Sequence, residues 1–245
     1  TTRDMMCHRT GLPRHDLVWY SAKTKRDSLI YAIRYFEPSA PLRQTWQYNN
    51  FMFLAQGVLA EKLSGKTWEE LIKEKIFTPL GMTASNTSMN DHQKAPDFSF
   101  GYREDEGKII KMKFMNIDAM GPAGSINSNA KDMANWVMLW INGGKFNGKE
   151  IISPAYYSQA ISSQMIIGGG LPTKEQSDVF FSNYGMGWFL ANYRGHYRVE
   201  HGGNIDGFSS STSFFPTDSI GVFVSVNQNG SPLPAIIRNT IVDRM

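Results

Sequence analysis

Residues 198–211 have the sequence RVEHGGNIDGFSSS, which is the pattern of a β-strand that stops at His201 and two glycines. Glycine weakens a strand unless a ligand or another backbone must come close, or the chain must adopt a conformation that other residues avoid. An edge-strand bulge also explains two glycines in a row. The pattern therefore predicts either a ligand-binding edge or a bulge at Gly202 and Gly203, beside a titratable imidazole.

Alternating apolar residues and turn signals around this stretch predict an antiparallel meander late in the chain. The expected strands cover residues 187–193, 196–200, 208–215 and 220–226. The dipeptide Arg194-Gly195 supplies the tight turn between the first two strands. A helix expected over residues 235–242 then covers one face of the sheet.

Earlier segments have the helical period instead. Apolar spacing predicts a helix of about four turns that starts at Asn50, and a capping box at Thr67 predicts the next one. Ser128 is expected to cap a third helix, and Ser153-Pro154 to start a fourth. Residues 85–124 show no long period, which indicates an extended excursion with short strands.

Helices first and an antiparallel sheet last indicate an α+β fold, in which an antiparallel sheet is flanked by helices and joined to a mainly helical subdomain. Residues 1–184 are expected to form a mainly helical region with cleft loops. Residues 185–245 are expected to supply the sheet strands and the C-terminal helix. Both parts belong to one domain, because 245 residues suffice to bury one sizeable core.

Composition excludes several classes of function. The 25 Lys and Arg residues nearly balance 22 Asp and Glu residues without a block of five like charges, so the sequence carries no footprint for nucleic acid or an anionic membrane. The single cysteine, Cys7, cannot form an internal disulfide. The adjacent His8 could activate its thiol only if the two side chains met, and adjacent residues on a helix point in different directions, which argues against a catalytic thiol. The histidines show no metal-ligand spacing, and no dinucleotide motif occurs, so we expect neither a metal nor a cofactor.

The tetrapeptide QYNN, residues 47–50, stands directly before the first long helix. Residues two apart in an extended segment point the same way, so Tyr48 and Asn50 could face one cleft. Tyr48 could act as a general base only if nearby cations lowered its pKa by about three units, which takes about 4 kcal/mol. A structural explanation, an asparagine helix cap beside a boundary aromatic, fits the same residues.

Six motifs in one order resemble the serine hydrolases of the class C β-lactamase and penicillin-binding-protein superfamily. The resemblance extends along nearly the whole chain and includes the family's Tyr-x-Asn element, its PLGM turn, and a His-x-Gly substitute for its Lys-Thr-Gly strand. The matching segments are RDMMCHRTGLP (3–13), QYNN (47–50), KIFTPLGMTAS (75–85), GPAGSINSNAKDMANW (121–136), YGMGWFL (184–190) and VEHGGNIDGFSSS (199–211).

This resemblance implies roles for the site residues. Tyr48 is expected to be the general base or proton relay, and Asn50 a residue that hydrogen-bonds either the substrate or the relay. His201 stands where the family often has lysine and is expected to supply a donor near the tyrosine. Gly202 and Gly203 let the substrate lie against the strand edge, and the backbone N–H of Asn204 serves as one oxyanion donor.

Two departures from the family pattern bear on activity. The family's nucleophile lies in a Ser-x-x-Lys helix shortly before the segment that resembles RDMMCHRTGLP, which places it upstream of Thr1. The one such motif within the chain starts at Ser128, where the family has a structural cap, so we expect capping and no nucleophile there. Histidine in place of lysine also lowers the positive charge available at neutral pH.

The expected function is therefore acyl-enzyme hydrolysis of amide, ester or β-lactam bonds in small peptide-like substrates, with the nucleophile supplied from upstream of Thr1 and this chain inert on its own. The alternative is a non-catalytic relative that serves as a binding or scaffold protein. A complementing N-terminal fragment is a possible partner, since the family sheet includes strands from that segment. The resemblance favours an extracytoplasmic location, and substrate specificity is expected in residues 85–124 and 165–182.

Overall fold

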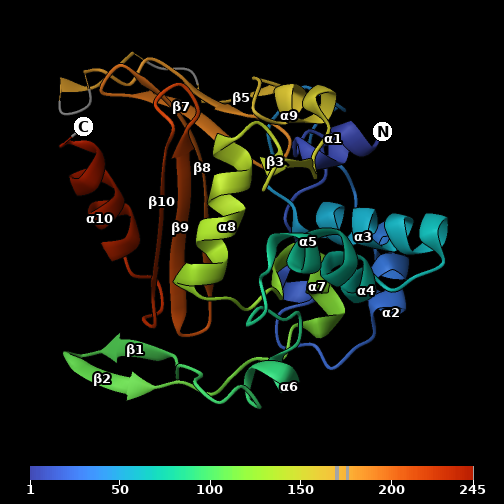
Figure 1. The fold of residues 1–245 in the computed structure, drawn as a ribbon. Coiled ribbons are helices and arrows are strands. Elements are labelled where there is room, and N and C mark those ends of the chain that lie inside the picture. Colours follow the sequence, from blue (N-terminus) through green and yellow to red (C-terminus); the bar gives the residue numbers. More distant parts are fainter. Residues whose placement is uncertain (169–170, 175–176, 245) are drawn as a thin grey trace.

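The computed structural model describes residues 1–168, 171–174 and 177–244, and it centres on a six-stranded antiparallel sheet (Figure 1). The strand order is β10-β9-β8-β7-β6-β5, so the last four strands form a simple meander. The strands of this sheet are β5 (Met165–Gly168), β6 (Ser182–Tyr184), β7 (Phe189–Tyr193), β8 (His196–Ile205), β9 (Phe208–Phe215) and β10 (Ile220–Val226).

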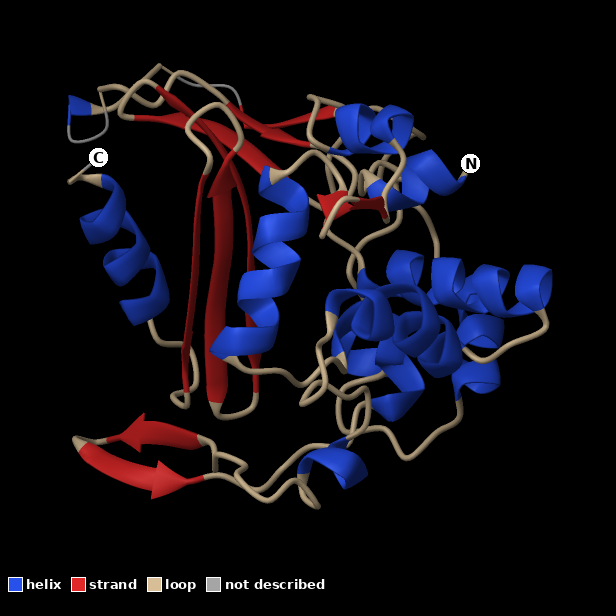
Figure 2. Ribbon diagram, viewed as in Figure 1, coloured by secondary structure: helices blue, strands red, loops and turns tan. Residues whose placement is uncertain are grey.

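Two helices cover opposite faces of the meander, α8 (Ala130–Ile141) and α10 (Leu233–Val242) (Figure 2). On the α8 face, Gly221 has no side chain because a Cβ there would lie 2.0 Å from Val137 of the helix. On the α10 face, the guanidinium of Arg238 bonds to Glu200 and to Ser211. Because side chains alternate along a strand, residues of even number in the 200–204 stretch share the α10 face, and His201 and Gly203 face the α8 side.

The helical part of the molecule packs beside the sheet around α3 (Asn50–Ser64). Asn49 caps this helix by accepting from the N–H of Phe51, and Gly65 ends it in the left-handed conformation. The other helices are α1 (Thr2–Met6), α2 (Arg26–Ala32), α4 (Trp68–Ile72), α5 (Thr78–Leu80), α6 (Met89–His92), α7 (Gly121–Gly124) and α9 (Pro154–Ala160).

The excursion over residues 85–124 contains a hairpin of β1 (Tyr102–Asp105) and β2 (Lys108–Lys111), which lies beyond one end of the main sheet (Figure 1). Its root is fastened to the sheet, because Tyr102 exchanges backbone hydrogen bonds with Asn227 and Asn229. Gly101 and Gly207 make the approach possible, since a Cβ on Gly207 would lie 2.5 Å from the Cα of Gly101. A second short hairpin pairs β3 (Lys145–Phe146) with β4 (Lys149–Glu150).

A buried carboxylate ties the first helix to the approach of α3. Asp4 is 1% exposed and accepts from Arg9 at 2.8 Å and from Arg43 at 2.9 and 3.0 Å. The hydrogen bond from Arg43 is the main cause that holds the pKa of Asp4 far below its usual range. Residues 4, 9 and 43 are thereby locked together, and the backbone N–H of Arg43 also donates to the carbonyl of Arg9 at 2.8 Å.

The α+β fold class is confirmed, and the strands predicted over residues 208–215 and 220–226 coincide with β9 and β10. Three details differ from the sequence-based expectation. The strand expected to stop at His201 continues to Ile205, because Gly202 and Gly203 pair with Ser211 and Ser210 of β9. The cap of α8 is Asn129 instead of Ser128, and the sheet also includes β5 and β6, from before residue 185.

Two pairs of residues in the expected specificity segment 165–182, namely 169–170 and 175–176, lie outside the described residues. The preceding stretch forms β5, which is joined to β6 with an irregularity between Ile166 and Gly168. No helix in the described ranges has the length and apolar character needed to cross a membrane.

Strand β10 is an edge of the main sheet, and its sequence IGVFVSV carries no charge. An uncharged apolar edge is a template for pairing with another strand. We expect the chain alone to self-associate, and Ser225→Lys, on an exposed position of this edge, to shift it toward monomer in size-exclusion chromatography. Ser99→Lys adds the same charge away from the edge and is the control; a monodisperse monomer of the unmodified chain would contradict the expectation.

Candidate active site

Tyr48 and His201, more than 150 residues apart in sequence, lie against each other with ring centroids 6.1 Å apart and ring planes 39° apart. Tyr48 ends the extended approach to α3, and His201 lies on β8. The segment before α3 and the middle of β8 thus meet where the helical part contacts the sheet. Both side chains are partly buried.

His8 holds Tyr48 in place. The carbonyl of His8 accepts from the N–H of Gln47 at 2.8 Å, and its Nδ1 accepts from the N–H of Asn49 at 3.1 Å. Its ring lies 4.3 Å from the Tyr48 ring. The residues on both sides of the tyrosine are therefore bonded to one fully buried histidine, which sequence reasoning had considered only as a neighbour of Cys7.

His201 is enclosed by aromatic rings from two neighbouring strands. Phe189 of β7 lies 5.2 Å away and Tyr184 of β6 lies 6.2 Å away, measured between ring centroids. The Nδ1–H of His201 donates to the carbonyl oxygen of Gly202 at 2.7 Å, and its Nε2 lies 3.1 Å from the hydroxyl oxygen of Tyr184. The donor that we expected His201 to offer to Tyr48 is thus directed to Gly202 instead.

Burial sets the charges of the pair. It raises the pKa of Tyr48 above its ordinary value, an effect that Arg14 opposes and Asp16 reinforces. It also lowers the pKa of His201, so the imidazole is neutral at pH 7. The cation nearest to the expected relay within the described residues is Arg14, whose guanidinium carbon lies 4.9 Å from the Tyr48 ring centroid.

Asn50 is turned toward the 14–20 loop. Its Nδ2 donates to Oδ1 of Asp16 at 3.0 Å, and the indole N–H of Trp19 donates to the same oxygen at 2.9 Å. Oδ2 of Asp16 accepts from Nε of Arg14 at 2.7 Å. Asn50 therefore orders the loop that borders Tyr48, and sequence reasoning had not assigned Arg14 or Asp16 to the site.

Strand β8 has an open edge directly after the histidine. Its pairing with β7 ends at Glu200, opposite Phe189, and the pairing with β9 continues to Ile205. Gly202, Gly203 and Asn204 are exposed and have a strand partner on one side only among the described pairings. An extended ligand backbone can add to such an edge.

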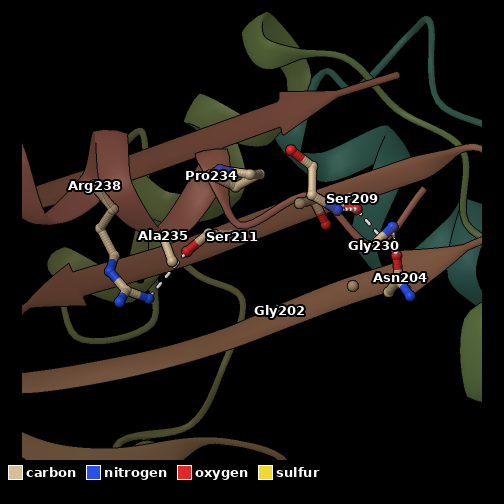
Figure 3. A pocket seen from close by; sticks show the side chains of 11 residues that line it. Gly202, Asn204, Ser209, Ser211, Gly230, Pro234, Ala235 and Arg238 are labelled. Atoms are coloured by element: carbon tan, nitrogen blue, oxygen red, sulfur yellow. Dashed lines mark hydrogen bonds between the residues drawn. The ribbon is translucent and has the colours of Figure 1, made fainter. Parts of the chain in front are cut away.

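A hollow of about 380 Å³ lies behind this strand, on the α10 face and not on the face of His201 (Figure 3). It is lined by polar groups of β8 and β9 and by the start of α10. Asn204 closes one end, where its Oδ1 accepts from Ser209 and from the N–H of Gly230, each at 3.0 Å. Arg238 lies at the other end beside Ser211.

Two other candidates can be placed. Cys7 is fully buried, and burial raises the pKa of its thiol, so it is an inert core residue. Ser128 lies outside α8, with its Oγ 2.7 Å from Oγ of Ser85, which in turn donates to Asp132 at 2.8 Å. The described residues contain no cluster of three or more His, Cys, Asp or Glu side chains suited to a metal ion.

Comparison with known proteins gives a family match over residues 1–243, to the model described as Beta-lactamase. An unguisins hydrolase of Aspergillus campestris is 31% identical over 237 residues, which cover 93% of this chain and 42% of that protein. The octameric penicillin-binding protein homologue of Pyrococcus abyssi superposes with a TM-score of 0.81 at 23% identity, covering 98% of this chain and 54% of its own.

A D-stereospecific amidohydrolase of a Streptomyces species superposes with a TM-score of 0.75 at 19% identity, covering 96% of this chain and 71% of its own. These structural likenesses concern the fold. The chain spans less than half the length of the two unguisins hydrolases it matches.

The buried His8 predicts how stability depends on pH. Burial lowers its pKa from 6.5 to about 3, so the folded chain binds fewer protons than the unfolded chain between those values. Stability is fully present above pH 6.5 and falls as the pH drops toward 3, by roughly 4 kcal/mol from this group. Urea unfolding across this range measures the slope, and His8→Gln should flatten it; an unchanged slope in that variant would contradict the assignment.

The contacts of Ser128 predict that it is not a nucleophile. After exposure to a fluorophosphonate, intact mass spectrometry of the chain should show no adduct at this serine, because it contacts another hydroxyl and no general base. Ser128→Ala is the control and should give the same spectrum. Labelling that disappears in this variant would overturn the assignment.

Proposed function

The chain belongs to the beta-lactamase family, and on that premise we propose that it is the larger part of a serine hydrolase that works through an acyl-enzyme. The bonds attacked are amide, ester or β-lactam bonds in small, peptide-like substrates. The observation that carries the proposal is the contact of Tyr48 with His201 next to the open edge of β8. The two residues expected from the family motifs meet at a position where a substrate can lie.

Tyr48 is the proposed proton relay, which takes the proton of the nucleophile and returns it to the leaving group. A relay needs a pKa near the working pH, but burial raises the pKa of this phenol. The required cation would come from the lysine of a Ser-x-x-Lys segment upstream of Thr1, together with Arg14. Without that segment we expect no turnover, since loss of a serine nucleophile typically lowers kcat about a millionfold.

The substrate is proposed to run beside residues 202–204 of β8. The two glycines leave room for its backbone, and the N–H of Asn204 is the proposed oxyanion donor from this chain. Asn50 acts from the other side, where it orders the loop that carries Asp16. Amide hydrolysis is the favoured reaction, because relatives in the comparison include an unguisins hydrolase and a D-stereospecific amidohydrolase by name.

The proposed partner is the upstream segment itself, either as part of the same polypeptide or as a separate complementing fragment. Two features of the fold support this. The uncharged strand β10 is an open edge where another strand can pair. The hollow beside α10 lies on the face of the sheet that α10 covers and offers space for a further segment. We also propose an extracytoplasmic location, as the family resemblance suggests.

A binding or scaffold protein is the second candidate. The observation that favours it is the neutral state of both site residues, since burial raises the pKa of Tyr48 and lowers that of His201. A protein of this class would bind peptide-like ligands along β8 and release them unchanged.

The test compares the chain with and without the sequence encoded upstream of Thr1, on a D-amino acid amide, a nitrophenyl ester and a β-lactam. We expect hydrolysis only when an upstream Ser-x-x-Lys is present. In that active form, Tyr48→Phe should lower kcat by about 10²–10⁴ because the relay is lost. Tyr31→Phe, which removes a hydroxyl from an exposed tyrosine on α2, is the matched control.

Binding of these substrates without turnover by the longer protein would favour the binding-protein candidate. Equal kcat values for the Tyr48→Phe and Tyr31→Phe proteins would remove the tyrosine from the mechanism, whichever bond is cleaved.

A further inference from the structure

Both ring nitrogens of His201 have a hydrogen-bond partner other than Tyr48. Nδ1 lies 2.7 Å from the carbonyl oxygen of Gly202, and Nε2 lies 3.1 Å from the hydroxyl oxygen of Tyr184. The rings of His201 and Tyr48 are tilted by 39°, with centroids 6.1 Å apart, and no hydrogen bond between them is among the described contacts. The hydrogen-bonding geometry of the histidine is therefore decided by Gly202 and Tyr184.

The first contact fixes where the ring proton lies. A carbonyl oxygen only accepts, so the hydrogen bond to Gly202 requires a proton on Nδ1. In a neutral imidazole, Nε2 then carries the lone pair and must accept. Within the described residues, the hydroxyl of Tyr184 is the group in position to donate, and its side chain is fully buried.

The opposite tautomer breaks the hydrogen bond to Gly202 and leaves the buried hydroxyl of Tyr184 without an acceptor. A proton on Nε2 would set the lone pair of Nδ1 against the carbonyl oxygen of Gly202 at 2.7 Å. It would also turn Tyr184 into the acceptor, and the phenolic proton has no other acceptor among the described hydrogen bonds. A buried polar group without a partner is destabilising, which disfavours this tautomer.

Tyr184 is held too firmly to release the histidine. It pairs with Phe189 of β7 and with Met165 of β5, and its carbonyl accepts from the N–H of Gln164 at 2.9 Å. The next residue, Gly185, packs so closely on Ala160 that a Cβ would lie 2.1 Å from its carbonyl oxygen. The hydroxyl of Tyr184 is thus presented to Nε2 from a rigid corner of the sheet.

We propose that Tyr184 is a positioning residue which, together with the Gly202 carbonyl, locks His201 as the neutral Nδ1–H tautomer and leaves it no nitrogen to exchange protons with Tyr48. This inference deepens the proposed function and rests on it for its catalytic meaning. It removes His201 from the proton path and makes it a neutral residue that packs beside Tyr48. Tyr48 must then exchange its proton with a group other than His201, such as the lysine of the upstream Ser-x-x-Lys segment.

The charged groups around the ring are consistent with a neutral state. Glu200, next in the strand, points to the opposite face, where Arg198 and Arg238 hold its carboxylate. Tyr48 and His8 face the ring from the helical part, and burial keeps each of them uncharged at pH 7. Tyr184 faces it from β6, where burial raises the pKa of its phenol further.

Nitrogen-15 NMR of the imidazoles in the full chain tests the proposal, with His201→Gln used to assign the His201 signals. We expect Nδ1 to be the protonated nitrogen of a neutral ring, and the ring to take up its second proton at a lower pH than a free imidazole does. In Tyr184→Phe, Nε2 should shift toward the position of a nitrogen without a hydrogen bond. Tyr48→Phe, which removes the other hydroxyl facing the same ring, should leave Nε2 where it is.

A protonated Nε2 in the unmodified chain would overturn the proposal. So would equal shifts of Nε2 in the two tyrosine variants, because a purely structural effect of losing a hydroxyl would not single out Tyr184. If Tyr184→Phe does not fold, the tautomer of the unmodified chain decides alone. These readouts need no turnover, so failure of the hydrolase proposal and failure of this one are separate results.

Discussion

The placement of Tyr48 depends on two backbone hydrogen bonds to His8. The N–H groups of Gln47 and Asn49 both end on this histidine, one on its carbonyl and one on its ring. Because a neutral imidazole is needed to accept from Asn49, the geometry of the site depends on keeping His8 uncharged. Its full burial provides that condition. The ion pairs of Asp4 with Arg9 and Arg43 hold the same two segments together a few residues away.

The site is a neutral, aromatic cluster with its charges at the margin. His8, Tyr48, Tyr184 and His201 are all uncharged at pH 7, and the ion pair of Arg14 with Asp16 borders them. A positive group brought next to Tyr48 would act in a poorly solvated environment, where its effect on the phenol is stronger than in water. In the proposed mechanism Tyr48 is a relay that an additional cation would activate, so the chemistry depends on what supplies that cation.

Local patterns predicted the sheet well and its details less well. Alternation and turn residues located β9 and β10 to the residue, because each strand has one face against α8 and one against α10. The glycines of β8 misled the prediction of its end, since the pairing partners Ser210 and Ser211 lie beyond a turn. The sequence predicted Ser128 as the cap of α8, but the cap is Asn129. Ser128 contacts Ser85 instead, and sequence spacing does not reveal that contact.

The candidate site likewise has residues that the sequence predicted and residues that it missed. Tyr48 and His201 could be named because their motifs resemble a family, whereas His8 and Tyr184 act through contacts across 41 and 17 residues that no local pattern encodes. The segment RDMMCHRTGLP resembles a family motif, but that resemblance does not reveal the contact of His8 with Asn49. Tertiary contacts between buried polar groups are therefore the part of the site that needed coordinates.

The hairpin of β1 and β2 carries a different consequence. Its root is bonded to Asn227 and Asn229 and packed at Gly101 on Gly207, whereas its tip at Glu106 and Gly107 is exposed. Residues can be inserted into or deleted from such a tip without disturbing the sheet, because the contacts at the root do not involve the tip residues. Divergence among related proteins should therefore accumulate at the tip, and the glycine contact at the root should be the slowest part to vary.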